Sequence, residues 1–110
     1  MTLTDKTGAP VTVTKESDRF TVGVDGKTAG HTAYVERDGR RVFFHTEVSD
    51  GFEGRGLATL LIGAALAATR DEDVRIVPVC SMVAAYVDKH PEFAAIADEA
   101  TPEIRESLPD

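Results

Sequence analysis

The side-chain pattern changes once along the chain, from a two-residue repeat to a helical repeat, and this order constrains the fold most. Phe20, Val22 and Val24 alternate with polar or small residues, as a half-buried strand requires. From residue 55 to residue 70 the apolar residues follow a helical spacing instead. Strands followed by a helix within a short chain predict a mixed α/β domain.

Two turns divide the first part of the chain into three antiparallel strands. Asp25-Gly26 tolerates the positive φ angles of a type I′ turn, and a second turn lies at residues 37–40. We expect strands over residues 19–24, 27–36 and 41–48. Strict alternation in the third strand sorts its side chains onto two faces, Val42, Phe44, Thr46 and Val48 on one and Phe43, His45 and Glu47 on the other.

The second part of the chain predicts a βαβ unit followed by short helices. Residues 74–77 are rich in β-branched side chains and precede a proline, so we expect a strand there. A helical crossover connects it to the strand before it, so the two strands are expected to be parallel. Ser81 is expected to cap the next helix, which ends near His90 because a residue before proline disfavours helical geometry. A last short helix is expected from Pro91 to Ile96.

The 110 residues are enough for one domain and too few for two. We expect an N-terminal extension or edge strand over residues 1–17, the folded domain over 18–98, and an acidic tail over 99–110.

Charge and cysteine content exclude several classes of function. A net charge of −7 argues against binding to nucleic acid and mildly favours a cationic partner such as an amine. The longest apolar stretch, residues 57–68, is well short of the ~20 residues that cross a bilayer. Cys80 is the only cysteine, so it forms no intramolecular disulfide and shows no zinc-site spacing. We expect a cytoplasmic protein that binds no metal and no membrane.

A glycine turn, Gly54-Arg55-Gly56, precedes the predicted crossover helix. Bare backbone lets a phosphate approach, and the amides of Leu57 and Ala58 in the first helical turn would point at it. Arg55 would add a charge-assisted contact. Two glycines are also compatible with an ordinary turn before a core helix. The Gly-Lys-Ser/Thr sequence of the P-loop and the third glycine of the dinucleotide fingerprint are both missing.

An antiparallel meander followed by one βαβ unit with this turn resembles the GNAT superfamily of N-acyltransferases. The resemblance covers residues 19–96 and includes a His-Thr pair at a strand end and a Cys-Ser pair after the next strand, as in a minimal group of GNAT-like proteins. Gly51 stands where the superfamily turn usually begins with Arg or Gln. The matching residues are Val48, Gly54-Arg55-Gly56-Leu57-Ala58, Val77-Pro78-Val79-Cys80-Ser81 and His45-Thr46.

The resemblance implies an N-acetyltransferase that uses acetyl-CoA and an amine of a protein or a small molecule, as a monomer or weak dimer. The pantetheine arm would lie between splayed strands at Val48 and Val77, and backbone groups near Thr46 would pair with it. Amides of residues 55–58 would hold the pyrophosphate, with Ser81 close by. The alternatives are a non-catalytic acyl-CoA binding or sensing module, and a plain interaction domain whose glycine turn is accidental.

Cys80, His45 and Thr46 are the predicted catalytic residues. Cys80 lies between a strand and a helix, where the helix dipole would favour its thiolate, so it could be acylated or could protonate the leaving sulfur. A lone cysteine is also often a small buried hydrophobe. His45, followed by Thr46, can deprotonate an amine or thiol, or can be structural. Glu47 shares the strand face with His45, and Tyr86 has the wrong spacing for the superfamily's tyrosine acid and is interpreted as packing.

Overall fold

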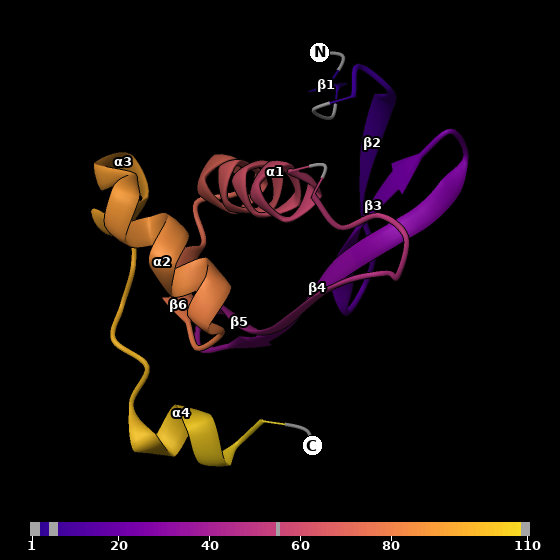
Figure 1. Cartoon of the computed structure of the whole chain (residues 1–110). Helices are drawn as coiled ribbons and strands as arrows, with labels where there is room; N and C mark the ends of the chain where they lie inside the picture. Colours follow the sequence, from indigo (N-terminus) through magenta and orange to yellow (C-terminus); the bar gives the residue numbers. More distant parts are fainter. Residues whose placement is uncertain (1–2, 5–6, 55, 109–110) are drawn as a thin grey trace.

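The computed structural model describes residues 3–4, 7–54 and 56–108, and these form one six-stranded sheet and four helices (Figure 1). The strands lie in the order β1-β2-β3-β4-β5-β6 across the sheet. Their bounds are β1 Leu3–Thr4, β2 Pro10–Lys15, β3 Arg19–Val24, β4 Lys27–Arg37, β5 Arg40–Val48 and β6 Arg75–Pro78. The helices are α1 Leu57–Asp71, α2 Ser81–Lys89, α3 Pro91–Ala94 and α4 Pro102–Glu106.

The strand pairing confirms the predicted mixed sheet. Strands β1 to β5 form an antiparallel meander, and β6 runs parallel to β5 after the α1 crossover. Asp25 and Gly26 have φ angles of 51° and 80°, and Asp38 and Gly39 have 53° and 76°, so both turns use the left-handed backbone that the sequence predicted. The segment predicted as an extension or edge strand, residues 1–17, contains β2, which pairs with both β1 and β3.

Helices α1 and α2 cover the same face of the sheet (Figure 1). Helix α1 buries one side against the strands, with Leu61 and Leu66 fully covered. Gly63 on α1 admits Tyr86 of α2, since a Cβ at Gly63 would lie 2.6 Å from the Tyr86 hydroxyl oxygen. Tyr86 also stacks on His90 with ring centroids 3.8 Å apart, so it is a packing residue of the α1–α2 contact.

A buried arginine joins the meander to α1. Arg41 on β5 is only 1% exposed, and its guanidinium donates to Glu36 on β4 at 2.6 Å and to Thr69 on α1 at 3.1 Å. It also donates to Glu72, just after α1, at 3.1 Å. Hydrogen bonds from Arg41 and from Lys15 lower the pKa of Glu72 to about 2. The arginine thus connects the middle of the sheet to the end of α1.

The segment after α3 continues along the outer edge of β6. The Ile76 amide donates to Ile96, the Asp98 amide donates to Ile76, and Ile76 and Ala97 form a parallel bridge. Helix α3 therefore ends at Ala94 and not at the predicted Ile96, because the next residues pair with β6. The predicted acidic tail contains α4, whose amide of Ile104 donates to the capping Thr101 hydroxyl at 3.3 Å.

None of the helices that the described residues form is both long and apolar enough to cross a bilayer.

Candidate active site

Strands β5 and β6 separate in the middle of β5. Their pairing ends at Phe43 opposite Pro78, and the amides of Val79 and Cys80 both donate to the Phe43 carbonyl, at 3.0 and 2.9 Å. The predicted point of separation at Val77 is one pair too early, because Val77 still pairs with Val42. Beyond Phe43, residues 44–48 have β4 as their only strand neighbour among the described residues. This part of β5 therefore leaves one edge without a strand partner.

A chain of hydroxyl and thiol groups lies beside this separation. The Thr46 and Thr32 side-chain oxygens are 2.9 Å apart and buried, and the Cys80 thiol donates to the Thr46 oxygen at 3.4 Å. The structure thus brings the predicted Thr46 and Cys80 together. Thr32 was missed by the sequence analysis, although His31-Thr32 repeats the His45-Thr46 dipeptide on the neighbouring strand, and that repetition was the available signal.

Phe44 forms a β-bulge that changes which side of the sheet its neighbours face. Ala33 pairs with His45 and Tyr34 pairs with Phe43, so Phe44 has no partner on β4. Phe43 lines a small cavity under α1 together with Thr32, which bonds Thr46, whereas Phe44 and His45 line a cavity on the opposite face. The predicted strict alternation is therefore wrong across the bulge, since Phe43 and Thr46 share one face.

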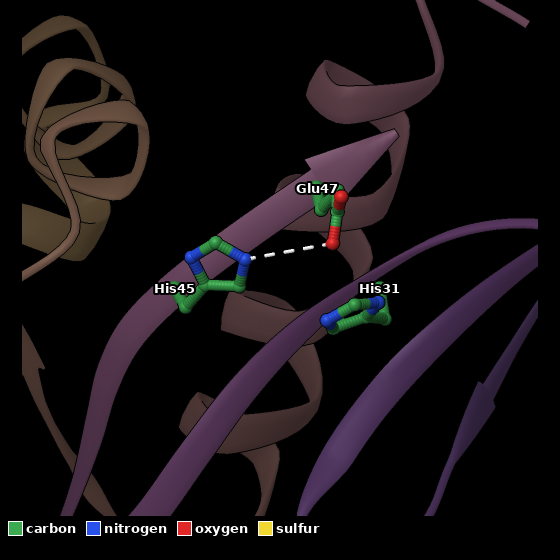
Figure 2. A group of neighbouring side chains, drawn as sticks. All are labelled: His31, His45 and Glu47. Carbon is green, nitrogen blue, oxygen red and sulfur yellow. Dashed lines mark ion pairs between the residues drawn. The ribbon is translucent and has the colours of Figure 1, made fainter. Parts of the chain in front are cut away.

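The bulge separates two of the predicted catalytic residues. Thr46 and Cys80 lie on the face of the sheet that α1 and α2 cover. His45 points to the opposite face, which we call the outer face, and there it lies beside Glu47 and His31 (Figure 2). The His45 Nε2 atom is 3.6 Å from a Glu47 carboxylate oxygen. The predicted pairing of His45 with Glu47 on one strand face is confirmed, but His45 and Cys80 do not converge.

The outer face carries a hollow of about 620 Å³ next to His45. His31 lines it as well, and burial together with the Arg19 charge lowers the pKa of His31, so its neutral form is favoured at neutral pH. Arg19 is itself paired with Asp18 at 3.2 Å. The lining residues are Asp18, Arg19, His31, Ala33, Tyr34, Val35, Phe44 and His45.

The predicted glycine turn leads into α1 as expected. Gly54 and Gly56 have φ angles of 80° and 76°, which favour glycine, and Gly56 occupies the N-cap position of α1. No side chain among the described residues caps this helix. A Cβ at Gly54 would meet no atom of the described residues within 4 Å, its two chain neighbours aside. Arg55 lies outside the described residues.

The remaining predicted cofactor contacts lie at the start of α1, at the end of β5 and at the start of α2. The backbone amides of Leu57 and Ala58 begin α1, and Val48 ends β5 opposite Gly30. The predicted capping role of Ser81 is wrong: Cys80, with an extended backbone, occupies the N-cap of α2, and the exposed Ser81 is the first helical residue. A cap needs a non-helical backbone, which Ser81 does not have.

Comparison with known proteins identifies first the fold and then the family. The structure matches the NMR structure of a GCN5-like protein from Staphylococcus aureus with a TM-score of 0.62, over 83% of this chain and 91% of that one, at 19% identity. Residues 19–96 match the family model described as GCN5-related N-acetyl-transferase. The chain belongs to this family.

Curated relatives agree with this assignment. The chain is similar to Protein NATD1 of Gallus gallus, with 34% identity over 88 residues that cover 76% of this chain and 80% of the relative. Protein NATD1 of Homo sapiens is also 34% identical, over 76% of this chain and 78% of the relative.

Proposed function

We propose that this protein transfers an acetyl group from acetyl-CoA to an amine of a protein or small molecule. The observation that carries the proposal is the separation of β5 and β6 after Phe43, with the thiol of Cys80 and the hydroxyl of Thr46 in contact beside it. Membership of the acetyltransferase family supports acyl transfer as the type of reaction.

The residues around the separation fit coenzyme A. The start of α1 has no side-chain cap among the described residues and follows a glycine with open space above it, which suits a pyrophosphate. The edge of β5 near Thr46 and Val48 offers backbone groups to the amides of an extended arm. We propose that amides of Leu57 and Ala58 bind the phosphates, with Arg55 and Ser81 close to the cofactor.

The two faces of β5 would have different tasks in the reaction. Acetyl-CoA supplies an activated acetyl thioester. The amine nitrogen forms a bond to the acetyl carbon, the carbon–sulfur bond breaks, and the Cys80 thiol donates a proton to the departing sulfur, while Thr46 orients that thiol. His45 accepts the proton that the amine loses, provided that the amine approaches from the hollow on the outer face. Cys80 is then reprotonated from solvent.

A non-catalytic acyl-CoA binding module is the second candidate. The observation that favours it is the position of His45, which faces away from Cys80 and leaves no compact set of acid and base on one side of the sheet. Such a module would need the glycine turn and the free edge of β5, but neither of these side chains.

Titration with acetyl-CoA followed by an amine-transfer assay tests the proposal. We expect binding, transfer to at least one amine, and a loss of kcat/KM of about 100-fold or more in Cys80→Ala, as expected for a lost general acid. The isosteric Thr46→Val tests the orientation of the thiol. Binding without transfer to any amine would favour the binding module, and no binding of coenzyme A would contradict both.

Intact mass after incubation with acetyl-CoA alone separates the two roles of Cys80. A proton donor keeps the mass of the free chain, whereas an acylated cysteine gains one acetyl group that Cys80→Ala does not gain.

A further inference from the structure

Two histidines and one glutamate meet on the outer face of the sheet (Figure 2). His31 on β4 and Glu47 on β5 are directly paired across the two strands, and His45 precedes Glu47 by two residues. Side chains two residues apart on a strand share a face, so all three project from the same side. One ligand atom of each lies within 4.8 Å of the others. A single ion can therefore reach all three after small rotamer changes.

The donor atoms of this cluster are available. Among the residues that the structure describes, no hydrogen bond occupies the ring nitrogens of His31 or His45. The His45 Nε2 atom and a Glu47 carboxylate oxygen are 3.6 Å apart, which is longer than a hydrogen bond. The nearby cation, Arg19, is paired with the carboxylate of Asp18, which reduces its repulsion of a bound ion. The cluster also lies on the paired strands β4 and β5, so their register holds its spacing.

The chemistry of the donors selects the kind of ion. Two imidazoles and one carboxylate suit Zn²⁺ and similar transition-metal ions. A single carboxylate is too few for Ca²⁺ or Mg²⁺, which prefer sites made of oxygen atoms. Three protein ligands leave a coordination position open for water or for another ligand. His31 and His45 both line the hollow of about 620 Å³, so that position would be reached from the hollow.

We propose that His31, His45 and Glu47 form a binding site for a divalent transition-metal ion, with Zn²⁺ as the ion that the donors fit best. The site is separate from the proposed coenzyme A contacts, which lie on the covered face and at the start of α1. It shares only His45 with the proposed acetyl transfer, and its formation does not need acetyl-CoA. It was hidden from the linear sequence because its ligands come from two strands.

The bulge at Phe44 is what makes the cluster possible. Ala33 pairs with His45, so His45 lies diagonally next to His31 on the outer face and not on the face that the helices cover. Exposure also favours an exchangeable ion, because the His45 and Glu47 side chains are 56% and 63% exposed and can move toward a ligand.

Calorimetric titration of the whole chain with Zn²⁺, without acetyl-CoA, tests the site. We expect one ion per chain, no competition from Mg²⁺, and affinity at least about 10-fold weaker in each of His31→Asn, His45→Asn and Glu47→Gln. Titration with Co²⁺ adds a visible absorption spectrum that reports its ligands. His90→Asn is the matched control, since it removes the third histidine from a different part of the fold and should bind normally.

Two results would overturn the site. One is an absence of stoichiometric Zn²⁺ binding by the native chain. The other is binding that survives in His45→Asn and Glu47→Gln but is lost in Cys80→Ala, which would place the ion on the thiol. Circular dichroism of each variant confirms that it is folded. Both of these residues are exposed, so their substitution leaves the core intact.

Discussion

Gly30 on β4 lies close against the backbone of β5. A Cβ at this position would stand 2.6 Å from the Glu47 carbonyl oxygen and 3.2 Å from the Val48 Cα, and both are backbone atoms that cannot rotate away. A residue without a Cβ therefore permits this close approach of the two strands at the end of β5 that borders the proposed cofactor edge.

We expect Gly30→Ala to lower the free energy of unfolding by about 1 to 3 kcal/mol, the usual cost of forcing an atom into a packed site. Urea unfolding monitored by circular dichroism measures this change. Gly63→Ala is the matched control, because its Cβ would meet the end of the Tyr86 side chain, which can rotate, and not backbone atoms. In addition, alanine inside a helix is more stable than glycine by roughly 0.5–1 kcal/mol. Equal losses in the two variants would contradict the argument.

At the scale of elements, the start of α1 carries the proposed phosphate contacts. Gly54 has a φ of 80° and open space where a side chain would project. A substitution there changes two things, the backbone preference and the room for a ligand. These effects can be separated, because Gly39 in the turn between β4 and β5 has a similar φ of 76° and equally open surroundings.

We expect Gly54→Ala and Gly39→Ala to lose similar stability, about 1 kcal/mol for a side chain in the left-handed region. Only Gly54→Ala should weaken coenzyme A binding, by about 10-fold, because its methyl group occupies the approach to the helix amides. Calorimetric titration with coenzyme A measures the difference. Similar coenzyme A affinity in the two variants would place the phosphates elsewhere.

At the scale of the whole molecule, two carboxylates join distant parts of the chain. Glu72 accepts hydrogen bonds from Lys15 on β2 and Arg41 on β5, and Asp98 accepts them from Arg40 and Arg75. These hydrogen bonds lower the pKa of each carboxyl to about 2. Both carboxyl groups thus have a lower pKa in the folded state than in the unfolded state. Their contribution to the free energy of unfolding is therefore complete above the ordinary carboxyl pKa and is lost as the pH falls toward 2.

We therefore expect the unfolding free energy to fall between about pH 5 and pH 2. Glu72→Gln should lose about 1 kcal/mol at neutral pH, a small value because Glu72 is partly exposed, and the difference from the native chain should shrink as the pH falls. Asp71→Asn is the control, since Arg41 does not contact that neighbouring carboxylate. A constant difference at all pH values would contradict the assignment.

The sequence was sufficient for the parts of the fold that depend on local patterns. Alternation and turn chemistry located β3, β4 and the parallel crossover, and the Cys-Ser and His-Thr pairs located Thr46 and Cys80 beside the separating strands. It could not reveal the buried position of Arg41, whose partners lie on three different elements. The division of the chain into extension, domain and tail stays a prediction, as do the roles of the individual site residues.

The one extra residue at Phe44 also decides which face of the sheet each later side chain of β5 lies on, whatever the type of that side chain. If β5 instead kept a regular two-residue alternation through Phe44, every side chain from His45 to Val48 would lie on the other side of the sheet. The imidazole would then enter the helix-covered interior, and the threonine that meets the thiol would face water.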